Sequence, residues 1–344
     1  MINIENLVYI LIYTLLINTL FSQINLFRDN KNLFKHKSFI SDKTTPVFSG
    51  GFIFLFTILI FYKVESFIYY IFFILVFLIG LFSDLNFLKS PNKRFLIQGV
   101  CVIVFLIFAE TFIESIRIEF VDNLLENYLF KIFFTSFCIL ILINGSNFID
   151  GVNTLASGYY ILVLFFSLLI TKDLNINIED SNFIFLIIFS LLCLFLLNFI
   201  NKLYLGDNGA YLISAFVGIY LIDLSNSEKL ISPYFIMNLL WYPAYENLFS
   251  IIRKIIGKKS ALSPDNLHLH QLLYLFLKKN LSLNQKVINS MTGMLINFFN
   301  LIIFFLSFQD YSNTKYQIIV IVISLSLYNF SYWILKKLNK GFNN

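Results

Sequence analysis

Three aspartates lie in short polar segments that interrupt long apolar runs. Asp84 lies in GLFSDLNFLKSPNKRFLIQ, Asp150 in NGSNFIDGVNTLASG and Asp207 in NKLYLGDNGAYL. Carboxylates provide hard oxygen ligands for Mg²⁺, and proteins usually hold this ion with one or two carboxylates together with substrate phosphates. The three aspartates are therefore candidate catalytic residues.

Amide and cationic side chains accompany these carboxylates. Asn144 and Asn147 precede Asp150 at intervals of three residues, which places the three side chains on one face of a helical turn. Cationic side chains in or near the polar segments could neutralise phosphate charge; they are Lys93, Arg94, Lys202 and Arg253.

The segment SALSPDNLHLHQLL brings Asp265 close in sequence to His268 and His270. A spacing of two residues puts side chains on different faces of a helix, so the histidines form a poor metal pair. We expect them to hydrogen-bond a substrate instead.

Each of these segments also has a purely structural interpretation. Asp207 or Asn208 could cap a helix, an arrangement worth about 1 kcal/mol. The asparagines and glycines of NGSNFIDGVNTLASG are typical of turns. Lys93 and Arg94 could anchor a membrane helix at the headgroups.

The elements that must position these residues are membrane helices. Of 344 residues, 58% are hydrophobic and 13% are charged, which is too much apolar surface for a soluble fold. Most apolar runs approach the roughly 20 residues that cross a bilayer. We therefore predict a single all-α, polytopic transmembrane domain over residues 1–344, with about eleven spans (10–11), at 5–23, 47–62, 66–83, 95–113, 129–143, 154–171, 183–200, 209–222, 232–249, 289–308 and 316–335.

Two local features refine this prediction. No small-residue cleavage site follows the first span, which indicates a retained helix and not a signal peptide. Cys101, Cys138 and Cys193 fall inside predicted spans without CxxC spacing, so neither a disulfide framework nor a cysteine metal site is indicated.

Basic residues orient the predicted spans. With eleven spans, 19 of the 25 Lys and Arg residues fall on one side, which the positive-inside rule assigns to the cytoplasm. The N-terminus is then periplasmic and the C-terminus cytoplasmic. The polar segments all fall on the cytoplasmic side, together with a small set of acidic residues: Asp29, Asp42, Asp84, Asp150, Asp207, Glu246 and Asp265.

In order and spacing, these segments resemble motifs of the polyprenyl-phosphate N-acetylhexosamine-1-phosphate transferase family, a branch of glycosyltransferase family 4 with MraY-type and WecA-type enzymes. The matched positions are Gly80, Asp84, Leu88, Arg94 and Gln98; Asn144, Asn147, Asp150, Gly151, Leu155, Ala156 and Gly158; Asn198, Lys202, Gly206, Asp207 and Gly209; Pro243, Glu246, Arg253 and Lys254; and Ser263, Pro264, His268 and His270.

Three positions depart from the family pattern. Ser83-Asp84 stands where the family has an Asp-Asp pair, Glu246 replaces the commoner Asp, and Gln271 breaks the last histidine pair. The carboxylates that the resemblance assigns to Mg²⁺ remain.

The resemblance implies transfer of a sugar 1-phosphate from a UDP-amino sugar to undecaprenyl phosphate in the bacterial inner membrane, with Mg²⁺, or alternatively Mn²⁺, as cofactor. Asp207 and Asp84 are the implied metal ligands, and Asp150 would organise the metal, acceptor phosphate or nucleotide. The residues implied to bind substrate are Ser83, Lys93, Arg94, Asn144, Asn147, Asn198, Lys202, Arg253, Asp265, His268 and His270.

The lipid bilayer is the expected environment, no nucleic-acid partner is expected, and a homodimer stays open. The loop of about 36 residues from Arg253 to Ile288 leaves little room for recognising a glycopeptide. It therefore favours the WecA-like branch, which starts O-antigen or other surface glycans, over the peptidoglycan branch. The sequence also leaves open a polytopic transporter and a catalytically impaired family member that acts as a scaffold.

Overall fold

The computed structural model describes residues 4–23, 48–63, 66–175, 178–258 and 267–339, and their regular structure is helical. The helices are α1 (Ile4–Gln23), α2 (Gly50–Phe61), α3 (Phe67–Asp84), α4 (Pro91–Ala109), α5 (Glu119–Leu125), α6 (Tyr128–Ile149), α7 (Leu155–Asp173), α8 (Ile178–Phe199), α9 (Gly206–Ser227), α10 (Pro233–Ile256), α11 (Leu269–Asn280), α12 (Gln285–Phe308) and α13 (Thr314–Asn339).

Each predicted span overlaps one of these helices, and α5 and α11 are additional short helices. Within the described residues, nine helices are long and apolar enough to cross a membrane: α1, α3, α4, α6, α7, α8, α9, α12 and α13. At 12 residues, α2 is shorter. The chain is a multi-pass, all-α membrane protein.

One predicted boundary is wrong in a way that matters for function. The span predicted at 129–143 continues as α6 to Ile149, so Asn144 and Asn147 lie within the helix. A hydropathy reading stops at the first polar residues, whereas backbone hydrogen bonds continue wherever neighbouring helices accommodate those side chains.

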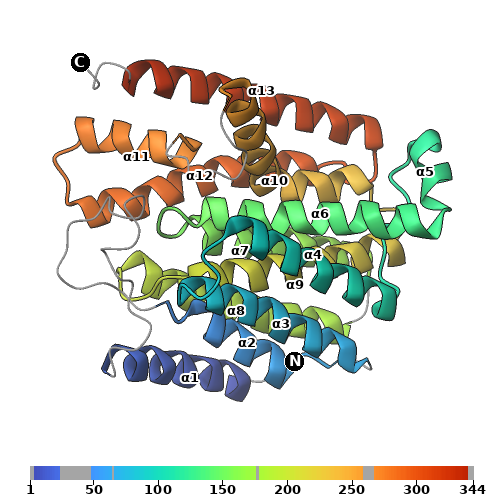
Figure 1. Ribbon diagram of the computed structural model, residues 1–344, viewed down its shortest axis with the longest axis horizontal. Coiled ribbons are helices and arrows are strands. Elements are labelled where there is room, and N and C mark those ends of the chain that lie inside the picture. The colour runs from blue at the N-terminus through green and yellow to red at the C-terminus, as the bar shows by residue number, and fades with distance from the viewer. Residues whose placement is uncertain (1–3, 24–47, 64–65, 176–177, 259–266, 340–344) are drawn as a thin grey trace.

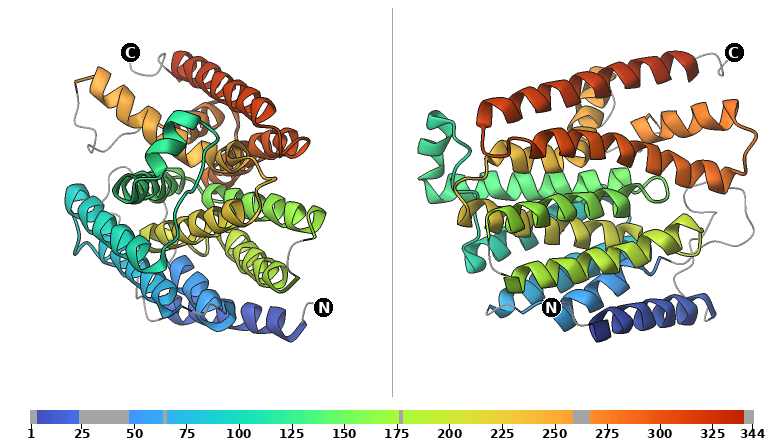
Figure 2. Two further views of the ribbon diagram at one scale, coloured as in Figure 1. Left: turned by 90° about the vertical axis from the view of Figure 1, so that its right-hand side faces the viewer. Right: turned by 180° about the vertical axis from the view of Figure 1, so that it is seen from behind.

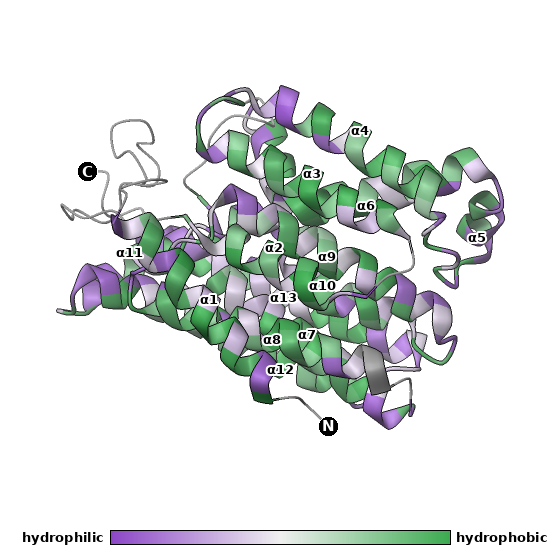
Figure 3. Cartoon of the chain, turned by 90° about the horizontal axis from the view of Figure 1, so that it is seen from below, coloured by the Kyte–Doolittle hydropathy of each residue, from purple (hydrophilic) through white to green (hydrophobic). Residues whose placement is uncertain are grey.

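The long helices run side by side in one bundle, with α5 and α11 at opposite ends (Figures 1 and 2). Helix α9 lies in the middle, where it contacts α2, α3, α6, α7 and α10. Hydrophilic residues gather towards the two ends of the bundle, and apolar residues cover its length (Figure 3). We refer to the end that carries α11 as the α11 end.

Two glycines let neighbouring helices approach the start of α9. A Cβ atom added at Gly80 of α3 would lie 2.4 Å from the Cα of Asn208. A Cβ atom added at Gly51 of α2 would lie 2.8 Å from the carbonyl carbon of Asn208. Real Cβ atoms do not come this close to backbone, so both positions need a residue without a side chain. The close approach brings the last turn of α3 to the first turn of α9.

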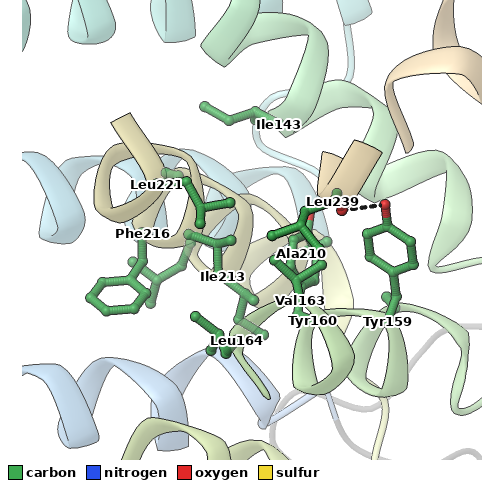
Figure 4. Close-up of a cluster of buried hydrophobic side chains, with 14 of the residues drawn as sticks. Ile143, Tyr159, Tyr160, Val163, Leu164, Ala210, Ile213, Phe216, Leu221 and Leu239 are labelled. Carbon is green, nitrogen blue, oxygen red and sulfur yellow. Dashed lines mark hydrogen bonds between the residues drawn. The ribbon is translucent and has the colours of Figure 1, made fainter. Parts of the chain in front are cut away.

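A proline opens the backbone of α10 one turn before Glu246. Pro243 has no N–H, so the carbonyl of Leu239 loses its partner within the helix. The Tyr159 hydroxyl of α7 donates to that carbonyl at 2.7 Å (Figure 4). Such a replacement matters because an unpaired backbone group inside a membrane costs several kcal/mol.

Candidate active site

Asp84 caps the start of α9 from the end of α3. Its carboxylate accepts hydrogen bonds from the backbone N–H groups of Asp207 and Asn208, both at 3.0 Å, and from the Asn208 side-chain amide at 2.6 Å. The first N–H groups of a helix have no partner within it, and they carry a partial positive charge that favours an anion. Both Asp84 oxygens are therefore engaged by α9, while its predicted role as a Mg²⁺ ligand stays a prediction.

Asp207 extends from the same turn and meets two other site residues. Ser83 Oγ donates to Asp207 Oδ2 at 2.5 Å, and Arg94 Nη1 lies 3.1 Å from the same oxygen. Arg94 also donates to Ser83 Oγ. One Asp207 oxygen is thus held by a hydroxyl and a cation, whereas Oδ1 has no hydrogen bond to any described residue.

This arrangement fits a metal ion that is completed by substrate. Within the described part of the chain, no group of three His, Cys, Asp or Glu residues could hold a metal. Mg²⁺ does not require three protein ligands, because one or two carboxylates and the substrate phosphates usually hold it. Between Asp84 and Asp207, the hydrogen bonds described above engage both oxygens of Asp84 but only Oδ2 of Asp207, so Asp207 Oδ1 could serve as a ligand.

The last turns of α6 form the next part of the site. The Asn144 amide donates to Gln98 Oε1 of α4 at 3.1 Å, and the Asn147 amide donates to the Tyr211 hydroxyl of α9 at 2.9 Å. Asp150 follows the helix and is half-buried. The two asparagines therefore fix α6 against α4 and α9, and their roles towards substrate stay predictions.

Asn198 joins two loops at the same end of the bundle. Its side-chain oxygen accepts from the Thr154 N–H at 2.5 Å, and its amide donates to the Leu203 carbonyl at 2.8 Å. This bond network holds the loop after α6 against the turn before α9. The side chains of Lys93 and Lys202 are exposed and make no hydrogen bond or ion pair with the described residues.

A second cluster surrounds the buried carboxylate of Glu246 on α10. His268 Nδ1 lies 2.8 Å from Glu246 Oε1, and the Tyr328 hydroxyl of α13 donates to Oε2 at 2.7 Å. The Leu269 N–H also donates to Oε1, at 3.4 Å. Tyr328 could not be predicted from the sequence, because no pattern within α13 indicates a partner on α10.

The expectation that His268 and His270 point to different faces of a helix is wrong. Their rings stack at 5.6 Å with an interplanar angle of 11°. The reason is that His268 is the extended N-cap residue before α11, so helical periodicity does not apply to the pair.

His270 is fully buried, and its ring nitrogens have no hydrogen-bond partner among the described residues. Burial, reinforced by the neighbouring His268, lowers the pKa of His270 to about 3. Its Nε2 faces the backbone at Gly151, where an added Cβ atom would lie only 2.3 Å away. A neutral His270 ring thus lies against the loop that follows Asp150.

Arg253 supports the segment that leads to the histidines. Its guanidinium donates to the Leu267 carbonyl at 2.8 Å and to the Tyr332 hydroxyl at 3.2 Å, and it lies 5.5 Å from the Tyr332 ring centroid. Asp265, predicted to bind substrate, lies outside the described residues.

Helix α6 joins the two clusters. Asn147 is bonded to α9 beside Asp207, and the next residue, Phe148, packs its ring 5.1 Å from that of His268. The structure therefore brings the acidic cluster of α3, α4 and α9 and the histidine cluster of α10, α11 and α13 to one end of the bundle. The carboxylate, guanidinium and imidazole groups of these two clusters are suited to positioning a phosphate ester.

Comparisons with known proteins agree with this arrangement. Residues 66–225 match glycosyl transferase family 4, a region that contains the acidic cluster. The chain is 27% identical over 237 residues to the undecaprenyl-phosphate alpha-N-acetylglucosaminyl 1-phosphate transferase of Thermotoga maritima, covering 66% of this chain and 67% of the relative.

Two further relatives are similar over shorter stretches. The probable undecaprenyl-phosphate N-acetylglucosaminyl 1-phosphate transferase of Bacillus subtilis is 25% identical over 206 residues, covering 59% of this chain and 56% of the relative. The decaprenyl-phosphate N-acetylglucosaminephosphotransferase of Mycobacterium leprae is 27% identical over 161 residues, 38% of each chain. With the motifs and the site they build, these matches support the resemblance found in the sequence: over residues 66–225 the chain is similar to glycosyl transferase family 4.

Proposed function

We propose that this protein transfers an N-acetylhexosamine 1-phosphate, or a related amino-sugar phosphate, from a UDP-sugar to undecaprenyl phosphate. The products are undecaprenyl-diphospho-sugar and UMP. The names of the three relatives support a polyprenyl-phosphate acceptor and a phosphosugar transfer. The multi-pass fold supports a reaction at a membrane surface, where a lipid acceptor and a water-soluble donor can meet.

The observation that carries the proposal is the pairing of Asp207 with Ser83 and Arg94 at the start of α9. Phosphoryl transfer depends mainly on positioning and charge neutralisation. Arg94 supplies a fixed positive charge, and the helix start supplies oriented N–H groups. Asp207 keeps one carboxylate oxygen for a metal ion.

We assign Mg²⁺ to Asp207, with Asp84 holding the turn that presents it, and Mn²⁺ is the alternative ion. When bound, the ion would neutralise charge on the donor diphosphate as UMP departs. Asp150, Lys202 and the histidine cluster complete the proposed binding surface for the nucleotide sugar.

The acceptor needs little help to become a nucleophile. A phosphate monoester has a second pKa of about 6, so undecaprenyl phosphate is largely a dianion at neutral pH. We propose that one of its oxygens attacks the sugar-linked phosphorus of the donor directly. Ser83, bonded to Asp207 and Arg94, then orients those groups and does not accept a proton.

This proposal predicts a mild effect of Ser83→Ala. The substitution removes one hydrogen bond to Asp207 but leaves the Arg94 ion pair, so we expect a loss in kcat of about tenfold or less. Steady-state assays at pH 7 and pH 8 measure it. A Ser83→Ala enzyme that is inactive at pH 8, where the acceptor is fully ionised, would contradict direct attack.

We place the protein in the bacterial inner membrane, with the α11 end in the cytoplasm, and favour a WecA-like role in the first membrane step of O-antigen or another surface polysaccharide. The moderate length of the 253–288 connection supports this branch over the peptidoglycan branch.

The deciding experiment incubates purified protein with undecaprenyl phosphate, Mg²⁺ and radiolabelled UDP-GlcNAc, followed by other UDP-amino sugars. We expect a lipid-linked product that EDTA abolishes and added Mg²⁺ restores. An Asp207→Asn protein is the matched control for contaminating activity. Failure to form product from every UDP-N-acetylhexosamine would count against the transferase.

A further inference from the structure

A buried hydrogen-bonded chain links the last membrane helix to the histidine cluster. Tyr328 of α13 donates to Glu246 of α10, and Glu246 holds Nδ1 of His268. Tyr328, Glu246 and His268 are 1%, 0% and 5% exposed. Both carboxylate oxygens are engaged, as a buried charge requires if it is to be tolerated.

This bonding pattern determines which His268 nitrogen can meet a ligand. An ionised carboxylate only accepts hydrogen bonds, so His268 Nδ1 must carry the hydrogen that it shares with Glu246. Nε2 is the remaining polar atom of the ring. Only Nε2 is left for a phosphate oxygen or sugar hydroxyl.

Two neighbouring rings also restrain the His268 ring. His270 stacks on it at 5.6 Å, and Phe148 packs against it at 5.1 Å. The backbone N–H of His268 is in turn bonded to Gln271 Oε1 at 3.1 Å. A ring fixed by packing and by one bonded nitrogen presents the other nitrogen in a single direction.

We propose that Tyr328 and Glu246 are positioning residues that hold His268 in the Nδ1–H form, so that its Nε2 contacts the phosphate or sugar of the nucleotide-sugar donor. This inference rests on the proposed transferase function. It adds Tyr328, 82 residues from Glu246 in sequence, to the machinery of the site.

The first test reads the ring directly and needs no activity. The chain contains three histidines, so ¹⁵N-histidine labelling and NMR at pH 8.5, with His36→Gln and His270→Gln for assignment, can identify the His268 signals. We expect hydrogen on Nδ1 and none on Nε2, and a changed Nδ1 signal in Tyr328→Phe. A His268 ring with hydrogen on Nε2 would overturn the proposal.

The second test is kinetic. Tyr328→Phe removes one hydrogen bond to a charged group, so kcat/KM for the UDP-sugar should fall about tenfold. Tyr316→Phe is the matched control on the same helix, because its hydroxyl donates to the Leu306 carbonyl and not to the site. It should leave both the His268 signals and kcat/KM unchanged.

The two readouts separate the possible failures. If the Tyr328→Phe substitution changes only the NMR signal of His268, or changes only kcat/KM, the positioning role is overturned. If the wild-type protein has no transferase activity, the proposed function fails, yet the His268 spectrum still decides whether Tyr328 and Glu246 fix the ring.

Discussion

At the residue scale, the two aspartates at the start of α9 are held in different ways. Asp84 uses both oxygens to bind the N-terminal turn of α9, whereas Asp207 is held through one oxygen by Ser83 and Arg94. Capping a helix start stabilises the fold, whereas an open carboxylate oxygen can serve a ligand. Neighbouring carboxylates of the same type therefore have different expected effects on substitution.

The pair Asp84→Asn and Asp207→Asn tests this division. Asp84→Asn replaces an anionic cap with an amide, so we expect a loss of about 1–2 kcal/mol in stability as well as reduced activity. Asp207→Asn should lower kcat by about 100-fold or more with little change in stability. Thermal unfolding in detergent and transferase assays measure the two effects. Equal destabilisation by both changes would contradict the assignment.

His270 makes a prediction about pH. Its folded-state pKa of about 3 lies below the ordinary 6.5, so the unfolded chain binds more protons between these values. This contribution to stability is fully present above pH 6.5 and declines as the pH falls towards 3, by up to about 1.4 kcal/mol per pH unit. Unfolding temperatures at pH 7.5 and pH 5 measure it. The acid-induced decrease should be smaller in His270→Gln, and an equal decrease would argue against this cause.

At the element scale, α9 is the helix on which the site depends, and its first turn must touch α2 and α3. Gly80 and Gly51 permit that contact. The position of Asp207 relative to Ser83 is thus decided by backbone packing at residues that carry no side chain.

Gly80→Ala tests this packing. The new Cβ atom would lie 2.4 Å from the Asn208 backbone, so α3 and α9 must separate, and we expect destabilisation of about 2 kcal/mol or more and a large loss of activity. Gly99→Ala on α4 is the control, because its nearest neighbour would be a leucine methyl at 3.8 Å. It should be neutral or stabilising by up to about 1 kcal/mol. Similar unfolding temperatures for the two variants would refute the close-packing explanation.

At the scale of the whole molecule, the bundle has two different ends. The proposed site lies at the α11 end, and the opposite end is held together by Arg117, whose guanidinium donates to the carbonyls of Lys229, Ile231 and Ser312. A cytosolic nucleotide sugar can reach the site only if the α11 end faces the cytoplasm.

Cysteine labelling tests this orientation. In a protein whose three native cysteines are replaced by serine, Lys89→Cys marks the α11 end and Lys229→Cys the opposite end; both positions are exposed. A membrane-impermeant maleimide applied to intact spheroplasts should label Lys229→Cys and spare Lys89→Cys until the membrane is opened. Labelling of Lys89→Cys and protection of Lys229→Cys in intact spheroplasts would show the opposite orientation. The site would then face away from the cytoplasm, which would exclude a cytosolic UDP-sugar as the donor.

The sequence by itself indicated the helices and the resemblance to a family, and it predicted a common membrane face for the polar segments. The length of an apolar run and the distribution of charged residues are local properties of the sequence. The spacing of motifs can likewise be read from one sequence without knowing the fold. The tertiary structure decided which groups meet. Ser83 and Asp207 lie 124 residues apart, and Tyr328 and Glu246 lie 82 apart. Their hydrogen bonds follow from which helices pack together and how closely, and no local pattern encodes that.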